Sequence, residues 1–531
     1  MLPTINTQEL LSSLTAFAPE LVICGGIVAL LLIRILPSAD RLHLGWLAPL
    51  IVLAALVASW IEWVNGDYDT AASFAGMVTA DALTVYMRLL LLGFTLLVMV
   101  LNLLSGIPDR EDSGDFHVLL LGATLGMMLM SSASHLLMVY IAVEMASLPS
   151  YALAGFLKGR RLSSEAALKY VVYGGAASGV MLYGISLLAG RFGTGYLPEV
   201  ASSFALAMQQ PKLDAILLVG LLMVLVGLAF KLSAVPFHFW CPDVFEGAAA
   251  EVAGFLSVAS KGAAIALTGR FTLALVGALP GDAATPEQWK TVALYVGPAI
   301  AFFAAITATF GNLAAYSQTN LKRLLAYSTI AHAGYMLMPL ATLTREGLDA
   351  SLFYLIAYLF MNLGAFAIVA FIRNKTGTED LSGYGGMIYR APLLTAAMSI
   401  FLLSLVGLPP LMGYMAKFQI FAVLWNSYQQ FNNVGLLMLL VVGLLNTVVS
   451  LFYYVRVLKV MILDPAPEGA AGKPFSVPVG QSLFALALTL VVLVGIMFWD
   501  PLAIQGSGRA VSQFREIKPP ASAEPVAVTA R

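Results

Sequence analysis

Four ionisable side chains lie inside long apolar stretches of the sequence, where a change of charge can accompany proton movement. They are Glu144, Lys231, Lys261 and Lys417. A charged side chain at the centre of a bilayer costs about 2.5–3.5 kcal/mol even on the lenient insertion scale. We therefore expect all four to face the interior of a helix bundle. An ion pair that serves the architecture alone is the alternative, but buried pairs are often no more stabilising than apolar replacements.

Lysine is well suited to loading and releasing a proton. Burial can lower the pKa of an ammonium group by about 3–5 units, and a nearby carboxylate raises it again. At about 1.36 kcal/mol per unit, this range is comparable to the roughly 4.6 kcal/mol needed to move one charge against about 200 mV. We interpret Glu144 and the three lysines as a proton relay. His238 and His332, whose type titrates near neutral pH, are weaker candidates.

The composition of the chain excludes a soluble domain. Of its 531 residues, 60% are hydrophobic and only 11% are charged, against about 45–50% and 25% in soluble proteins. The formal net charge of −1 argues against a nucleic-acid partner. Cys24 and Cys241 stand far apart without a CxxC motif, so we expect no iron–sulfur cluster, structural zinc or c-type haem, and no other cofactor, bound by this chain alone.

Long apolar stretches predict an all-α integral membrane protein. A transmembrane helix needs about 20 mostly apolar residues, and about 14 stretches of the chain meet this length. They lie near residues 17–36, 44–64, 80–104, 115–132, 134–156, 164–190, 213–240, 247–276, 290–314, 321–341, 348–372, 392–425, 434–462 and 479–499.

Two of these spans contain helix-breaking residues near a lysine. Pro236 follows Lys231 in span 7, and Pro409 and Pro410 precede Lys417 in span 12. Paired interrupted helices indicate a transporter built from inverted repeats. We therefore predict two inverted five-helix repeats with spans 7 and 12 as equivalents. The predicted parts are three N-terminal helices in 1–114, repeats in 115–277 and 278–463, a connection and last helix in 464–505, and a mobile tail in 506–531.

The distribution of basic residues predicts the orientation. Cytoplasmic loops carry an excess of lysine and arginine, and the odd-numbered loops, with Lys158 and Arg160 among others, are richer in them than the even-numbered loops, to which we assign Arg191 and Arg270. With an even number of spans, both termini are expected on the outside.

Three segments resemble subunit N of NADH-quinone oxidoreductase, an antiporter-like membrane subunit of respiratory complex I. They are KLSAVPFHFWCPDVFEG at 231–247, NLKRLLAYSTIAHAGY at 320–335 and GLPPLMGYMAKF at 407–418. Their order and spacing agree with the 14 spans, most clearly over 115–462. One departure is visible: where the family has a proline-containing run after Gly247, this chain reads Ala-Ala-Ala-Glu251.

The resemblance implies a proton-pumping subunit in a bacterial inner membrane. It makes Glu144 and Lys231 a modulating ion pair, Lys261 the central relay group and Lys417 the exit-side group. It also implies partners: other membrane subunits of complex I, including sister antiporter-like subunits, and partner subunits that hold flavin and iron–sulfur clusters and reduce a quinone.

Two other functions stay open at this point. A subunit of a multisubunit sodium/proton antiporter uses related subunits without any redox partner. A membrane scaffold without transport would leave Lys231, Lys261 and Lys417 without a role.

Overall fold

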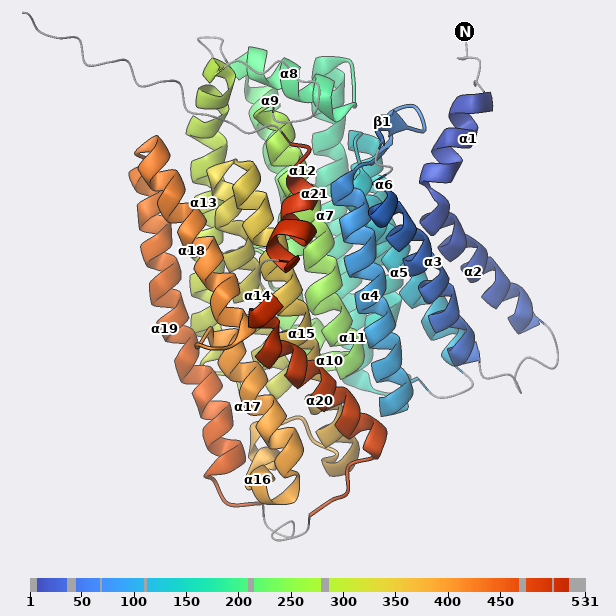
Figure 1. Cartoon of the computed structure of the whole chain (residues 1–531), viewed down its shortest axis with the longest axis vertical. Coiled ribbons are helices and arrows are strands. Elements are labelled where there is room, and N and C mark those ends of the chain that lie inside the picture. Colours follow the sequence, from blue (N-terminus) through green and yellow to red (C-terminus); the bar gives the residue numbers. More distant parts are fainter. Residues whose placement is uncertain are drawn as a thin grey trace, which may run out of the picture.

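The protein is a bundle of long helices that run up and down along one axis (Figure 1). The computed structural model describes residues 7–35, 44–66, 69–108, 112–208, 214–277, 286–467, 474–498 and 501–514. Within these ranges, twelve helices are long and apolar enough to cross a membrane. The predicted all-α integral membrane fold is confirmed.

The N-terminal part consists of membrane helices and one small hairpin. Its elements are α1 (Thr7–Ala16), α2 (Ala18–Ile35), α3 (Leu47–Asn65), β1 (Asp69–Ser73), β2 (Val78–Ala80) and α4 (Ala82–Ser105). The two strands pair antiparallel. Arg88 of α4 joins the three long helices, because its guanidinium binds Glu20 of α2 at 2.7 Å and Glu62 of α3 at 2.9 Å.

The next group of helices forms the first predicted repeat. Its elements are α5 (Ser113–Ser132), α6 (Leu136–Ala154), α7 (Arg161–Phe192), the short α8 (Leu197–Met208), α9 (Ala215–Leu232), α10 (Trp240–Gly247), α11 (Ala250–Phe255), a π-helical turn (Leu256–Ser260) and α12 (Lys261–Leu275). The last three run on as one span of 26 residues.

The second group repeats this order and is followed by the C-terminal elements. They are α13 (Pro286–Ala315), α14 (Leu321–Leu337), a 3-10 turn (Pro339–Thr342), α15 (Arg345–Thr376), a 3-10 turn (Leu381–Tyr384), α16 (Met387–Arg390), α17 (Pro392–Val406), α18 (Met412–Phe431), α19 (Val434–Ile462), α20 (Val479–Val494), a 3-10 turn (Gly495–Phe498), a π-helical segment (Pro501–Gly508) and α21 (Arg509–Val511).

The fourteen predicted spans are all found. Twelve are the long apolar helices; the other two are α14, with 17 residues, and the interrupted span formed by α17 and α18. The interruption falls on the fourth span of each five-span group, as α9 and α10 in the first and as α17 and α18 in the second. Because five is odd, corresponding helices of the two groups run in opposite directions.

Both interruptions coincide with a residue in the left-handed conformation. Ser233 ends α9 with φ +55°, and Gly407 ends α17 with φ +91°. The prolines that follow cannot continue a helix. Glycine is required at 407 for a second reason, since a Cβ there would lie 3.0 Å from Cδ of Lys417. The sequence signals for the two breaks are therefore confirmed.

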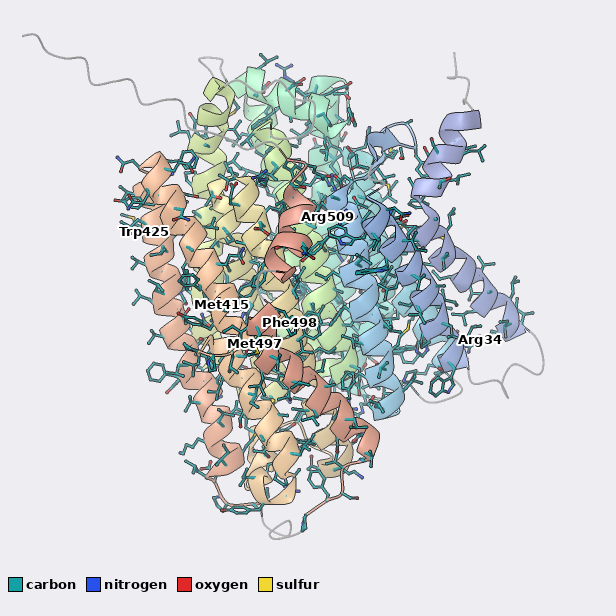
Figure 2. All side chains as sticks on the ribbon, viewed as in Figure 1. Arg34, Met415, Trp425, Met497, Phe498 and Arg509 are labelled. Atoms are coloured by element: carbon teal, nitrogen blue, oxygen red, sulfur yellow. The ribbon has the colours of Figure 1, made fainter. Side chains whose placement is uncertain are left out.

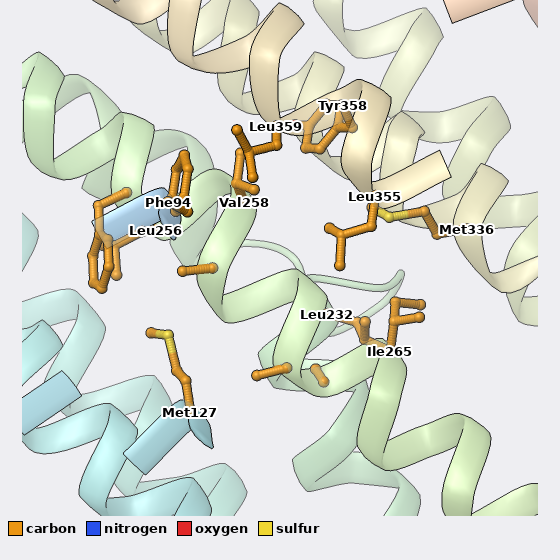
Figure 3. Packing of buried hydrophobic residues seen from close by; sticks show 14 of the residues in the cluster. Phe94, Met127, Leu232, Leu256, Val258, Ile265, Met336, Leu355, Tyr358 and Leu359 are labelled. Carbon is orange, nitrogen blue, oxygen red and sulfur yellow. The ribbon is translucent and has the colours of Figure 1, made fainter. Parts of the chain in front are cut away.

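The two central helices are the span from α11 to α12 and the helix α15. In their most apolar stretch of 18 residues, 100% and 89% of the residues are buried inside the protein, against 28% in the outer helices α2, α3 and α19. Figure 3 shows their contact, in which Val258 of the π-helical turn faces Leu359 of α15 and Leu355 lies near Ile265. These two helices join the first group to the second.

The outer surface is apolar, as a lipid-facing surface must be. Trp425, Met497 and Phe498 are exposed on the outside of the bundle (Figure 2). Exposed leucine, valine and phenylalanine side chains continue this surface along α7, α9, α13 and α19.

The C-terminal end differs from the prediction of a mobile tail from residue 506. Residues 506–514 pack against α4 and α15, and Ala510, Val511 and Phe514 are buried. Gln513 accepts a hydrogen bond from the N–H of Ala82 at 3.0 Å. The segment is ordered because its few apolar side chains cover the ends of these helices. Residues 515–531 lie outside the described ranges.

Arg270 was assigned to an even-numbered loop, and this assignment is wrong. It lies within α12, where its guanidinium is buried and binds both oxygens of Asp81, at 2.5 and 2.8 Å. Asp81 also caps α4 by accepting from the N–H of Thr84. The paired carboxylate makes burial of the arginine possible and fastens the end of α12 to α4.

We predict that Arg270→Met lowers the free energy of unfolding by about 3–5 kcal/mol, because it leaves the Asp81 carboxylate buried and uncompensated. Thermal unfolding of the detergent-purified protein measures the change. The double variant Arg270→Met/Asp81→Asn is the control and should regain most of the loss. A double variant as unstable as the single one would show that the pair is not the cause.

Candidate functional site

The three lysines of the predicted relay are buried inside the bundle. Lys231, Lys261 and Lys417 are 1%, 0% and 3% exposed. Glu144, on α6, is half-buried. The lysines therefore do not face lipid, and each must be stabilised by groups of the protein or by water.

Lys261 is held by the break in the first repeat. Its Nζ donates a hydrogen bond to Oγ of Ser233 at 2.8 Å and lies 4.5 Å from the ring centroid of Trp240. Ser233 is the left-handed residue that ends α9, and Trp240 begins α10. A cation over an aromatic face is stabilised by the ring quadrupole. The interruption thus supplies both partners of this ammonium group.

Lys417 is held by the break in the second repeat. Its Nζ donates to the backbone oxygen of Val406 at 2.9 Å and lies 4.5 Å from the ring centroid of Tyr335. Val406 is the last residue of α17, and the last carbonyl groups of a helix have no partner within it. The two lysines are thus held in the same way, each by a helix end and an aromatic ring.

Lys231 and Glu144 do not form the ion pair that the resemblance implies. The Lys231 Nζ and one oxygen of Glu144 are buried without a hydrogen-bond partner among the described residues. The Glu144 carboxylate acts on Lys231 electrostatically, without a direct contact between them. This correction leaves two buried polar groups that water or a change of conformation must satisfy.

His332 lies in a chain of hydrogen bonds that crosses the second repeat. Its Nδ1 is 2.6 Å from the hydroxyl of Tyr354 on α15, and its Nε2 is 3.1 Å from the hydroxyl of Tyr454 on α19. Tyr454 in turn forms a short hydrogen bond with Ser328 of α14. Every member of this chain can both donate and accept a hydrogen bond.

Further hydroxyl groups extend this polar cluster toward Lys417. Tyr358 donates to Thr329 at 3.0 Å, and the hydroxyl of Tyr335 lies 3.3 Å from that of Thr447. The ring of Tyr335 also faces Lys417, so Tyr335 contacts both the lysine and the hydroxyl groups of this cluster.

His238 is not part of either cluster. Its ring is buried between Phe239 and Phe310, with centroid distances of 4.4 and 4.5 Å. Its Nδ1 has no hydrogen-bond partner in the described part of the chain. The structure does not bring this histidine into contact with the lysines.

An apolar contact separates Lys261 from the cluster around His332. A Cβ on Gly262 would lie 2.7 Å from a methyl carbon of Leu355, so α12 packs tightly on α15 beside Lys261. Figure 3 shows Leu355 between Ile265 and Tyr358. Beside Gly262, an aliphatic side chain therefore lies between the polar groups at the two helix breaks.

The sequence analysis missed the residues that surround the relay. Ser233 could have been found from Pro236, because this proline predicts a helix end just before it, and Ser233 is the polar residue at that end. Tyr354 and Tyr358 are four residues apart in an apolar span, which places two hydroxyls on one helix face. Ser328 and Tyr454 had no comparable signal, because they meet only in the folded bundle.

The described residues provide no group of three or more histidine, cysteine, aspartate or glutamate side chains that could hold a metal ion. Both Cys24 and Cys241 are free. The two clusters consist of ammonium, imidazole and hydroxyl groups, each of which can donate or accept hydrogen bonds.

Comparison with known proteins places this arrangement in a family. The family model described as NADH:quinone oxidoreductase/Mrp antiporter, TM, matches residues 133–445. NADH-quinone oxidoreductase subunit N of an Anaeromyxobacter species is 38% identical over 510 residues, which cover 94% of this chain and 97% of that protein. The chain belongs to the subunit N family. Subunit N 2 of Sorangium cellulosum is 40% identical over 522 residues, or 96% and 99% of the two chains.

Solved structures agree with this membership. A chain of respiratory complex I from Thermus thermophilus has a TM-score of 0.72 and 30% identity, covering 92% of this chain and 99% of that one. A chain of the Mrp complex from a Dietzia species has a TM-score of 0.80 over 94% and 97% of the two chains, but only 19% identity, so it shows the fold alone. As a subunit N relative, the chain is a membrane subunit of NADH:quinone oxidoreductase.

We predict that Tyr354→Phe and Tyr454→Phe each lower the free energy of unfolding by about 1–3 kcal/mol, because each leaves one nitrogen of the buried His332 ring without a partner. Thermal unfolding in detergent tests this. Tyr183→Phe, at a 59% exposed position on α7, is the matched control and should change nothing. Equal midpoints in all three variants would argue against the hydroxyl–imidazole chain.

Proposed function

We propose that this chain translocates protons across the membrane for NADH:quinone oxidoreductase. Glu144, Lys231, Lys261 and Lys417 are the proposed relay, with His332 of the second repeat as a weaker additional member. The observation that supports it best is the environment of Lys261 and Lys417. Each is buried and yet bound to an atom that lies at a helix interruption.

The partner of Lys261 suits a group that changes its charge. The hydroxyl of Ser233 accepts from an ammonium ion, and it can rotate to donate to a neutral amine. The contact therefore survives loss of the proton. The Trp240 ring favours the cation, so a small movement of α10 relative to α12 changes how strongly Lys261 holds its proton.

His332 is the proposed link to Lys417. When imidazole accepts a proton at one nitrogen and releases one from the other, a proton moves across the ring and the tautomer changes. The hydroxyls of Tyr354 and Tyr454 are in place at both nitrogens. His238 is kept as a weaker candidate, since its unpartnered nitrogen lies in a buried position beside the first break.

The energy for this movement would come from partner subunits. Respiratory complex I is the assembly of one similar solved chain, and we propose other membrane subunits of such a complex, including sister antiporter-like subunits, as neighbours. Flavin, iron–sulfur clusters and the quinone reaction belong to those partners. The excess of basic residues in odd-numbered loops supports an orientation with both termini outside. We propose the bacterial inner membrane as the location, in keeping with the relatives from Anaeromyxobacter and Sorangium.

A sodium/proton antiporter subunit is the second candidate, because the Mrp chain shares the fold over nearly the full length. Identity favours the first proposal, at 38–40% with the two subunit N relatives against 19% with the Mrp chain. Purification of the tagged chain from native membranes in mild detergent separates the two. Flavin-containing partners and NADH oxidation by a quinone support the first, whereas membrane-only partners with sodium-driven pH changes in vesicles support the second.

We predict that Lys231→Met, Lys261→Met and Lys417→Met each lower the number of protons pumped per NADH oxidised by the reconstituted complex. Methionine keeps the length of the side chain and removes its proton. Pumping is measured in proteoliposomes with a pH-sensitive dye, and co-purification of the partners confirms assembly. Lys375→Met, at an exposed position near the end of α15, is the control. Unchanged pumping in all three assembled variants would leave only a scaffold role.

A further inference from the structure

A cavity lies beside the first helix break, between α9 and α10. It has a volume of about 290 Å³ and is bounded by α9, α12 and α13, with α8 at one end. Its lining runs from Leu217 in the first turn of α9 to Leu232 in the last and then reaches Ala234 and Phe237 in the break. The 18 residues of α9 are about 27 Å long, close to the roughly 30 Å of a bilayer's hydrocarbon core.

The lining of the cavity has few groups that could hydrogen-bond to water. Of its polar lining residues, Thr268 donates to Ala264 O at 2.7 Å and Thr272 donates to Gly269 O at 3.0 Å. Asp214 is bound by Arg191. A buried water needs two to four polar partners. Both threonine hydroxyls donate within α12, Asp214 is bound by Arg191, and the remaining polar group, the Tyr295 hydroxyl, belongs to a half-exposed residue, so the lining is almost entirely apolar. The occupant should therefore be a hydrocarbon.

The opening of the cavity lies on the lipid-facing surface. Leu218, Leu222 and Tyr295 line it and are 46%, 49% and 50% exposed. Since α9 and α13 cross the membrane, hydrocarbon chains of lipids reach this opening directly.

An ion pair of Arg191 with Asp214 lies at the end of the cavity where α9 begins. Arg191 donates from Nε to Asp214 at 2.7 Å, and this guanidinium lowers the pKa of the Asp214 carboxyl, so the pair stays charged. The guanidinium has five N–H donors, and its side chain is 50% exposed. Its outward donors can bind a phosphate, which arginine recognises well.

We propose that this cavity binds one acyl chain of an anionic phospholipid, with the phosphate on Arg191. The chain lies along α9 and ends against Ala234 and Phe237, next to Ser233, the residue that holds Lys261. The bound lipid thus supports the conformation of the break. Binding of the lipid does not depend on the proposed proton transfer. An effect of the lipid on proton pumping rests on the proposed function.

Photolabelling of the assembled complex tests this binding. The probe is phosphatidylglycerol with a diazirine at the end of one acyl chain, and the labelled peptides are identified by mass spectrometry. We expect label in the segments of α9 and α13. Ala299→Phe and, at the α8 end, Ala207→Phe fill the cavity and should reduce this label about tenfold or more, since overfilled sites exclude their ligand.

Leu294→Phe is the matched control, because it adds an aromatic ring at a 66% exposed position of α13 outside the cavity. It should leave labelling unchanged. Equal labelling in the filled variants and the wild type would overturn the proposal, and so would a wild-type complex in which α9 and α13 remain unlabelled because a partner covers them.

Competition with unlabelled lipids tests the role of Arg191. Phosphatidylglycerol should displace the probe at lower concentration than phosphatidylcholine, and Arg191→Gln should remove this preference. A preference that persists in Arg191→Gln would overturn the assignment of the phosphate to this residue. Because the readout is labelling, its outcome is independent of whether the three lysines pump protons.

Discussion

Two of the three lysines of the proposed relay, Lys261 and Lys417, take their hydrogen-bond acceptors from helix interruptions inside the bundle. A continuous helix uses its backbone carbonyl groups internally, so a membrane-spanning helix has none to offer to a neighbour. Where a helix ends inside the membrane, its last carbonyls become available. Val406 provides such an oxygen for Lys417, and the end of α9 places Ser233 against Lys261. The two helix interruptions therefore provide the hydrogen-bond acceptors on which the burial of Lys261 and Lys417 depends.

Each break creates polar groups of its own, and the neighbouring helices satisfy them. The N–H of Val235, just after α9 ends, donates to the hydroxyl of Thr307 on α13 at 3.0 Å. In the second repeat, Ser404 of α17 accepts from the N–H of Gly413 in α18 at 3.1 Å. The break in the first repeat is thus stabilised by the second repeat. The hydrogen bond between Val235 and Thr307 is one of the contacts that join the two repeats.

The sequence predicts those parts of the site that have a local signal. A lysine in an apolar run and a proline in a span are visible in the sequence, so Lys261, Lys417 and both breaks could be located in advance. The π-helical turn before Lys261 has no such signal. The pairing of Arg270 with Asp81 joins residues 189 positions apart, and Ser328 meets Tyr454 only through the packing of α14 on α19. Such contacts are decided by the tertiary structure.

The apolar contact between the two polar clusters limits how a proton can travel. Leu355 fills the space beside Gly262, and a proton does not cross aliphatic side chains without water or a polar group. The helix that carries Leu355 also carries Tyr354, which binds His332, and Asn362, which is hydrogen-bonded to Ser257 of the π-helical turn. A displacement of α15 therefore acts on both clusters at once. Since α15 is almost completely enclosed, the helices packed around it must transmit such a displacement. In the proposed function, a conformational change in a partner subunit would reach the proposed relay by this route.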